Sequence, residues 1–271
     1  MNALQSQLAA AEALIRAQPI TTASVALGAA LLPILMLAYQ DYRHYVSMGP
    51  HGLPDNFSGW YRQLRMRSAA QPLASTVVPA PYDLASAARA TGPYADQSFL
   101  ATAAALEPRR GARPRVCHFV APQRQESQVA AREMKDRMGG FLDGLVAANA
   151  AVFRRGLSRL EGPVPAVQLR RGDDGAEGGF PASHRVTRGE LIHVHPPDGS
   201  THLVLSLVDS AEVIRKGWGQ RHRLSGGMLG WGYTLVYAPR DEGELEAWKG
   251  IVMAAARFAA KEAVVEEVNL P

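Results

Sequence analysis

The longest apolar stretch of the chain lies near the N-terminus, where Ile20 to Tyr39 are twenty consecutive residues without a charge. At about 1.5 Å per residue, a helix of this length spans roughly 30 Å, the hydrocarbon thickness of a bilayer. Tyr39, Tyr42 and Tyr45 then follow, as in an interfacial aromatic belt. We predict a transmembrane signal-anchor over residues 20–39, with a cleaved signal peptide and a buried core helix as alternatives.

The C-terminal third shows the alternation that is typical of strands. Residues 189–195 and 202–208 are apolar or alternating, and the turn-forming sequence Pro196-Pro197-Asp198-Gly199 separates them. This pattern predicts a pair of adjacent strands. Other stretches predict strands over 116–121, 164–169 and 230–238, and helices over 125–155 and 210–216.

A long amphipathic helix is predicted over residues 242–268, after Pro239 and Asp241. It carries one apolar stripe, formed by Leu245, Trp248, Ile251, Val252, Ala255 and Phe258. We therefore expect an α+β fold, with a mainly antiparallel sheet packed by helices on one side. The transmembrane helix precedes it.

Four segments are predicted along the chain. They are an N-terminal segment (1–19), the membrane helix (20–39), a juxtamembrane and variable segment (40–105) and an α+β domain (106–271). Residues 46–60 are rich in Gly and Pro and predict irregular structure, and residues 64–90 have no clear period.

Composition narrows the class of protein. The chain has 271 residues, 47% of them hydrophobic, and a net charge of +4. No basic run interleaved with aromatic residues is present, so nucleic acid is not an expected partner. Cys117 is the only cysteine, which excludes an internal disulfide.

Four of the eight histidines lie between Leu191 and Gly226. His193 and His195 are two residues apart, so on a strand both point to the same face. His202 begins the next predicted strand and is expected across the turn from this pair. His222 comes from the Gly-rich sequence KGWGQRH. We expect strands and loop to build one pocket.

Three interpretations of this histidine set stay open. Three or four imidazoles from His193, His195, His202 and His222 can bind Zn, Fe or Cu, as in cupin-type sites. The glutamate expected a few residues after His-x-His is absent, and Asp198 is the nearest carboxylate. Neutral imidazoles can also remove an acidic enol proton. Finally, the histidines can simply bond backbone groups and order the turn.

The Gly-rich segment adds two candidate substrate-binding residues. Trp218 can stack on a flat aromatic ligand, or it can fill the core. Arg221 can hold an anionic oxygen through a forked hydrogen bond. Phosphate-binding Gly-rich motifs and the G-x-S-x-G motif of hydrolases are missing from the sequence.

Several blocks of the sequence resemble fungal luciferase and its luciferase-domain relatives, in the same order and after one N-terminal membrane helix. The blocks are DYRHYVSMGPHGLPDNFSGW, RPRVCHFVAPQRQ, ELIHVHPPDGSTHLVLSL, RKGWGQRHRLSG and VYAPRDEGELE. The shared positions include His193, His195, His202, Trp218, Arg221 and His222. One difference is the turn 196–199, where the luminous enzyme has an additional histidine.

The resemblance implies a membrane-associated oxidative enzyme. Fungal luciferase oxidises a hydroxylated hispidin with O2 through a peroxidic intermediate that loses CO2 and emits light. By this resemblance we expect O2 as co-substrate, no established dissociable cofactor, and a small aromatic or pyrone-like substrate. Light emission does not follow from the fold family alone.

These observations lead to a mechanistic hypothesis. The catalytic histidines, His193, His195, His202 and His222, deprotonate an enol, and Trp218, Arg221 and Asp198 bind the substrate. A metal-dependent cupin-like enzyme and a non-enzymatic ligand-binding module at a membrane are the alternatives. We expect a single-pass protein of the endoplasmic reticulum. The arginines after the apolar helix outnumber Arg16 before it, which favours a cytosolic C-terminal domain.

Overall fold

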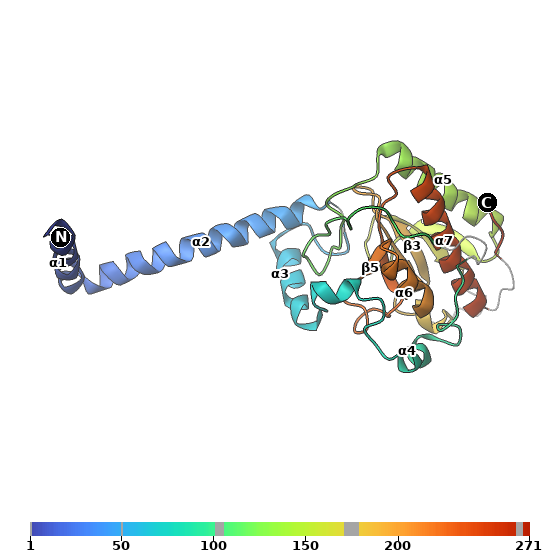
Figure 1. Cartoon of the computed structure of the whole chain (residues 1–271), viewed down its shortest axis with the longest axis horizontal. Coiled ribbons are helices and arrows are strands. Elements are labelled where there is room, and N and C mark those ends of the chain that lie inside the picture. The colour runs from blue at the N-terminus through green and yellow to red at the C-terminus, as the bar shows by residue number, and fades with distance from the viewer. Residues whose placement is uncertain (1, 50, 101–105, 171–178, 264–267) are drawn as a thin grey trace. The chain divides into compact units, whose positions relative to one another are not determined.

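The computed structural model describes residues 2–49, 51–100, 106–170, 179–263 and 268–271. It divides the chain into two compact units, Met1–Ser47 and Met48–Pro271. Figure 1 shows the order of the elements along the chain.

The first unit consists of α1 (Asn2–Ala17) and α2 (Pro19–Ser47). Helix α2 has 29 residues, and it is the one helix among the described residues that is long and apolar enough to cross a membrane. None of its most apolar window is buried, whereas a core helix would be mostly buried. The predicted apolar helix is therefore present, and α2 is a candidate for a single membrane span.

The second unit is built around one six-stranded sheet in which every neighbouring pair is antiparallel, in the order β1-β2-β3-β4-β6-β5. The strands are β1 (Phe153–Leu157), β2 (Pro165–Leu169), β3 (Glu190–Val194), β4 (Thr201–Val204), β5 (Gly219–Arg221) and β6 (Tyr233–Val236). The order shows that β5 lies at one edge and β1 at the other.

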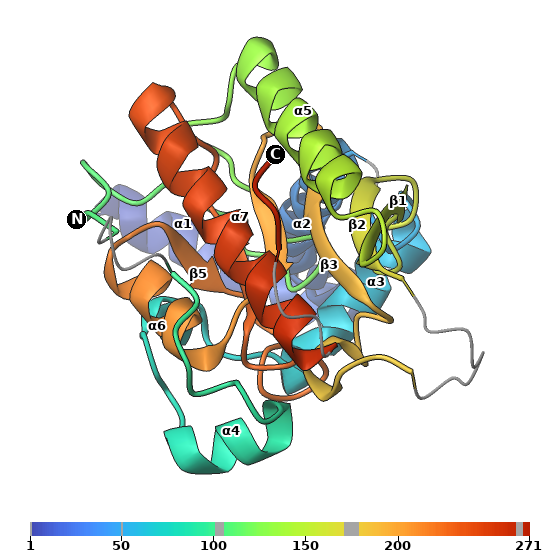
Figure 2. The ribbon, with the colours of Figure 1, turned by 90° about the vertical axis from the view of Figure 1, so that its right-hand side faces the viewer.

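Five α-helices of this unit are described: α3 (Phe57–Met66), α4 (Leu84–Thr91), α5 (Arg132–Ala148), α6 (Leu207–Arg215) and α7 (Glu242–Glu262). Helices α5 and α7 lie side by side over one face of the sheet (Figure 2). Helix α7 contacts the central strands β3 and β4, and α6 contacts β5 and β6. The sheet thus has one helix-covered face, as an α+β fold requires.

The predicted stripe of α7 is the centre of the hydrophobic core. All six stripe residues are completely buried. Five of them pack in one cluster with Ile192, Leu203 and Val236 on the sheet, and Phe258 packs with Val204 and Tyr233. The Asp241 side chain accepts a hydrogen bond from the Glu244 backbone N–H and so caps the first turn. Helix α7 ends at Glu262, before the predicted end at residue 268, and residues 264–267 lie outside the described ones.

The structure confirms the α+β class and the mainly antiparallel sheet. It confirms the strand pair around the turn at 196–199, the strands within 164–169 and 230–238, and the helix near 210–216. The predicted strand over 116–121 is reduced to an isolated bridge between Val116 and Gln125.

Three local expectations are wrong. The helix predicted over 125–155 is confined to α5, because Gln128 has a positive φ and Phe153 already begins β1. The segment KGWGQRH contains β5 instead of being all loop. Residues 46–60 were expected to be irregular, but helix α3 begins at Phe57. The Asn56 side chain caps it by accepting a hydrogen bond from the Gly59 N–H. The predicted domain boundary at 105/106 touches residues 101–105, which are not described, and it stays a prediction.

Candidate functional site

Three histidines share the sheet face that is opposite to α7. In the β3–β4 pair, His193 lies directly across from His202, while Ile192 lies across from Leu203 in the core. Side chains alternate along a strand, so the two histidines point away from the α7 side. His195, two residues after His193, joins them at the end of β3. The three imidazole rings have centroids 4.7 to 5.2 Å apart.

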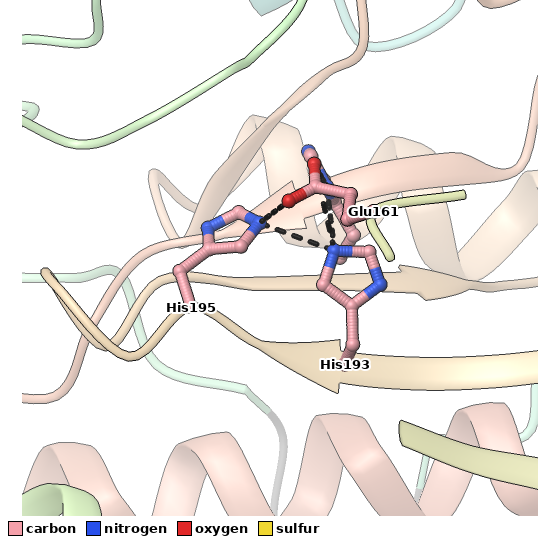
Figure 3. Close-up of side chains that lie close together, drawn as sticks. Glu161, His193 and His195 are labelled. Atoms are coloured by element: carbon pink, nitrogen blue, oxygen red, sulfur yellow. Dashed lines mark hydrogen bonds and ion pairs between the residues drawn. The ribbon is translucent and has the colours of Figure 1, made fainter. Parts of the chain in front are cut away.

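A carboxylate that follows β1 completes this group. Glu161 has one oxygen, Oε1, 3.7 Å from His193 Nε2 and 3.7 Å from His202 Nδ1. Its other oxygen, Oε2, is 3.6 Å from His195 Nε2. Figure 3 shows the carboxylate directed toward the rings of His193 and His195. We call Glu161, His193, His195 and His202 the His3Glu cluster.

Arg124 holds the carboxylate of the cluster from the other side. Its Nη1 donates to Glu161 Oε1 at 3.1 Å, and its Nη2 donates to Oε2. Arg124 is 2% exposed and Glu161 is 8% exposed, so this two-pronged ion pair is buried. The pair fixes the position of Glu161 beside the histidines.

Each histidine of the cluster also has a partner on its outer ring nitrogen. His193 Nδ1 is 2.5 Å from Glu190 Oε1, His195 Nδ1 is 2.8 Å from Ser200 Oγ, and His202 Nε2 is 3.0 Å from Gln123 Oε1. These contacts orient the rings. They leave the other nitrogens, His193 Nε2, His195 Nε2 and His202 Nδ1, facing one another and Glu161.

Glu190 shares the histidine face because strand β3 is irregular. Its pairing with β2 shifts between Val167 and Gln168, so that Gln168 is opposite Glu190 and Val167 is opposite Ile192. The extra residue, Leu191, breaks the alternation. The Glu190 carboxylate therefore reaches His193 Nδ1, and it also accepts hydrogen bonds from the Ser158 hydroxyl and the Arg159 N–H.

Burial and the surrounding charges set the protonation of the cluster. Burial alone would raise the pKa of Glu161, but Arg124 and the histidines hold that pKa well below 4.5. Burial lowers the pKa of His193, and the carboxylates Glu161 and Glu190 outweigh it and raise this pKa to about 9. Glu161 is thus an anion, and His193 is the most basic position of the cluster.

The other two cluster histidines are poor proton acceptors from water. Burial, with a further contribution from Arg124, lowers the pKa of His195 to about 3. Burial likewise holds the pKa of His202 well below 6.5. Both imidazoles are therefore neutral at physiological pH, which is the form that binds metals.

An apolar cavity of about 260 Å³ opens beside the cluster. Glu161, His222 and Tyr233 line it together with Leu53, Met66, Leu160, Leu224, Met228 and Leu229. This volume is slightly below the lower end, about 300 Å³, of common ligand pockets, and it suits a molecule with one or two flat rings. Glu161 is the member of the His3Glu cluster that lines this cavity.

His222 lies next to the cluster but is bonded differently. Its ring centroid is 5.4 Å from that of His202, and its Nδ1 accepts the Leu224 N–H at 3.0 Å. Burial lowers the pKa of His222 to about 3. A neutral ring whose Nδ1 accepts carries its proton on Nε2. His222 is therefore a hydrogen-bond donor at the cavity wall.

The predicted substrate-binding residues lie elsewhere. Arg221 is opposite Thr234 in the sheet, on the α6 side, and its guanidinium donates to the carbonyls of Val78, Pro79 and Trp231. Trp218 belongs to the hydrophobic core and donates from Nε1 to the Glu107 carbonyl. The structure does not bring either to the cavity, and their substrate-binding role has no geometric support.

Asp198 supports the turn after β3. Its Oδ1 accepts the Ser200 N–H at 2.6 Å and is 3.8 Å from His195 Nδ1. Burial raises the pKa of this carboxyl group. Asp198 thus contacts Ser200 and His195 and does not line the cavity. Its predicted contact with substrate stays a prediction.

Sequence reasoning missed Arg124, Glu161 and Glu190. Arg124 and Glu161 lie in segments without periodicity, far from the histidines in sequence. Glu190 is three residues before His193, and strict alternation would put it on the opposite face. Their burial and the ion pair of Arg124 with Glu161, which identify them, are visible only in the structure.

The fold and site define an α+β protein in which buried histidines and a carboxylate adjoin an apolar cavity, an arrangement typical of enzyme centres. Residues 188–255 match the family model described as the luciferase domain. The luciferase of Neonothopanus nambi is 30% identical over 251 residues, covering 88% of this chain and 86% of that protein. The luciferase of Armillaria ostoyae is 28% identical over 248 residues, covering 89% and 88%.

The chain therefore belongs to the fungal luciferase family. The match to the domain model contains β3, β4 and His222, so three of the four cluster residues fall within it, and Glu161 precedes it. No solved structure matches the chain.

Proposed function

We propose that this protein is an O2-dependent oxidative enzyme that acts on a flat, acidic enol, such as a hydroxylated pyrone or another aromatic enol. One observation carries the proposal. The apolar cavity has the cluster carboxylate Glu161 and the donor His222 in the same wall. A flat ring fits against the apolar side chains of the cavity, and its hydroxyl group then lies near Glu161 and His222. Membership in a family whose relatives are luciferases supports the choice of O2 as co-substrate.

The reaction is written in two steps. The enol O–H loses its proton to the neutral form of His193, the most basic position of the His3Glu cluster, and the Glu161 carboxylate in the cavity wall, 3.7 Å from His193 Nε2, relays it. The anion places electron density on the adjacent ring carbon. That carbon forms a C–O bond with O2, which takes up two electrons, and the resulting peroxide recovers the proton. The product is a hydroperoxide, so substrate and O2 are consumed one to one.

His222 and Tyr233 have donor roles in this proposal. The His222 Nε2–H and the Tyr233 hydroxyl belong to side chains of the cavity wall. Burial holds the pKa of Tyr233 well above 10, so its hydroxyl keeps its proton. Donors in a dry cavity stabilise the negative charge that develops on the enol oxygen and on the peroxide.

The test uses the full-length protein in detergent with a hydroxylated hispidin as substrate. O2 consumption and light are recorded separately, because the proposal requires only the first. An O-methylated derivative of the same pyrone lacks the acidic proton and should not be consumed. A folded sample that binds the pyrone but takes up no O2 would favour a ligand-binding module over an enzyme.

We also propose that α2 anchors the protein in the membrane of the endoplasmic reticulum, with the second unit in the cytosol. The length and hydropathy of α2 support the anchor. The excess of arginine after the helix supports the orientation. Protease protection in sealed microsomes tests it, because a cytosolic second unit is digested without detergent.

A further inference from the structure

We infer that the His3Glu cluster binds one divalent first-row transition-metal ion through His193 Nε2, His195 Nε2, His202 Nδ1 and a Glu161 oxygen. The ligand atoms of these four residues all lie within 4.8 Å of one another. The inference concerns the same site as the proposed function, but it rests on the geometry of the cluster and not on the reaction.

The tautomer of His202 follows from a chain of hydrogen bonds. Gln123 Nε2 donates to the Arg221 carbonyl at 3.2 Å, which identifies the amide nitrogen. Gln123 Oε1 must then accept from His202 Nε2, 3.0 Å away. A neutral His202 with its proton on Nε2 has a bare lone pair on Nδ1, the atom that faces the cluster.

The same argument applies to the other two rings. Glu190 is a carboxylate that can only accept, so His193 Nδ1 carries a proton. Ser200 Oγ is 2.8 Å from His195 Nδ1 and accepts a hydrogen bond from it when that nitrogen carries the proton of the ring. With these tautomers, Nε2 of neutral His193 and of neutral His195 is unprotonated.

Three nitrogen lone pairs thus meet beside a carboxylate. His193 Nε2 is 3.2 Å from His195 Nε2 and 3.3 Å from His202 Nδ1. Between unprotonated nitrogens such contacts are repulsive, so either a metal ion lies between the atoms or His193 Nε2 carries a proton. Bonds of about 2.0–2.1 Å to a metal place two tetrahedral ligand nitrogens about 3.3–3.4 Å apart. The observed separations already have the spacing of metal ligands.

The outer partners match those of metal-binding histidines. Such rings almost always donate their second N–H to a carboxylate, a carbonyl or water, which fixes the ring and raises the basicity of the ligating nitrogen. Here Glu190, Ser200 and Gln123 play these parts, each from a buried position. If the histidines only ordered the turn at 196–199, three rings fixed in this way would not be needed.

Charge in the cluster favours a cation. With neutral histidines, Arg124 offsets one carboxylate, Glu161, while Glu190 is left with one negative charge. A divalent ion more than offsets this charge, and one proton on His193 neutralises it. The two occupants compete for His193 Nε2, so a measurement of bound metal decides between them.

Glu161 takes the place of the glutamate that His-x-His sites usually have a few residues downstream. It comes from the segment between β1 and β2, and it also lines the cavity. Three nitrogens and one oxygen select Fe2+, Co2+, Ni2+ or Zn2+ over ions that prefer thiolates or oxygen alone. An ion held there acts as a Lewis acid on a substrate oxygen that enters from the cavity.

The experiment measures metal directly in the full-length protein, which carries no polyhistidine tag. The protein is stripped with a chelator, reloaded with Co2+, freed of excess ion and analysed for cobalt per chain and for visible d–d absorption. We expect one cobalt ion per chain with a spectrum of mixed nitrogen and oxygen ligands. Cobalt below one tenth of this ratio at saturating loading overturns the inference and favours the proton.

Variants locate the ion. His202→Gln and Glu161→Gln should reduce the cobalt affinity at least tenfold, whereas His222→Gln, a neighbouring non-ligand histidine, should keep one ion per chain. Near-ultraviolet circular dichroism of the buried aromatic side chains confirms folding, and the conservative His195→Asn replaces any variant that fails this check. Equal cobalt binding in the wild type and in folded His202→Gln and Glu161→Gln overturns the assignment.

The result is independent of turnover. One bound cobalt ion without O2 uptake on any enol supports the metal site and contradicts the proposed function. O2 uptake by a chelated protein that binds no cobalt supports the function and contradicts the metal site.

Discussion

The Nε2 atoms of His193 and His195 lie 3.2 Å apart. The Nδ1 atom of each ring is held by a hydrogen-bond partner, Glu190 for His193 and Ser200 for His195. Here Glu190 and Ser200 hold them together, and the Arg124–Glu161 ion pair closes the group. The geometry of the His3Glu cluster therefore depends on residues around it, and substitutions of these residues test the role of the cluster.

Glu190→Gln tests a positioning residue that does not reach the cavity. The change keeps the shape of the side chain but removes the charge that holds His193 Nδ1. Loss of such an outer carboxylate costs about 10–100-fold in metal affinity or activity. We expect this loss in cobalt affinity and in kcat, with KM unchanged. Glu246→Gln, which only breaks an exposed contact with Lys249, is the control. Equal effects of the two variants would contradict the role of Glu190.

Arg124→Met tests the buried ion pair with Glu161. Removing one partner of a buried pair leaves an uncompensated charge and costs about 3–5 kcal/mol in the free energy of unfolding. The exposed pair of Arg137 and Glu242 offers a matched control, since its loss should cost less than about 1 kcal/mol. Urea denaturation of Arg124→Met, Glu161→Gln and the double variant measures the coupling. Purely additive losses would show that the pair does not act as a unit.

Part of this site could be predicted from the sequence. Alternation at 191–195 was enough to place His193 and His195 on one face, and the turn at 196–199 was enough to put His202 across from them. These are local relationships with a period of two, and periodicity is visible in a single sequence. The apolar stripe of α7 was visible for the same reason.

The remainder depends on contacts that have no local pattern. Glu161 and Arg124 meet the histidines only after the sheet has formed, and each comes from a segment without periodicity. Arg221 lies on a different side of the sheet from the one that its sequence context suggested. Its Gly-rich context predicted a loop ligand, but the three-residue strand β5 turns it to the α6 side. A short edge strand is too brief for its alternation to be recognised.

His222 should act as a hydrogen-bond donor from Nε2, and two variants separate this role from its structural one. Asn keeps an acceptor for the Leu224 N–H but has no donor at the Nε2 position, whereas Gln places an amide N–H there. Loss of one such donor costs about 10²–10³-fold in kcat. We expect this loss in His222→Asn and a much smaller one in His222→Gln, in steady-state O2 uptake. Equal losses would contradict the donor role.

Arg221→Met distinguishes a structural arginine from a substrate ligand. The guanidinium satisfies the carbonyls of Val78 and Pro79 at 2.8 and 2.7 Å, and buried carbonyls left unpaired cost about 1–3 kcal/mol. We expect a lower free energy of unfolding, with KM unchanged for the folded fraction. Urea denaturation and KM for the pyrone are measured on the same sample. A tenfold or greater rise in KM, without loss of stability, would instead support the predicted contact with substrate.

Helix α2 should determine membrane association. An arginine at the centre of a spanning helix costs about 2.5–3.5 kcal/mol, so the triple variant Leu27→Arg, Leu31→Arg, Leu35→Arg should release the protein from membranes. Leu4→Arg, a similarly exposed leucine in α1, should not. Flotation after carbonate washing measures the bound fraction, and the mass of the purified chain shows whether α2 is retained. A mature chain that lacks α2 would identify a cleaved signal peptide. An uncleaved wild type that fails to float would show that α2 does not span the membrane.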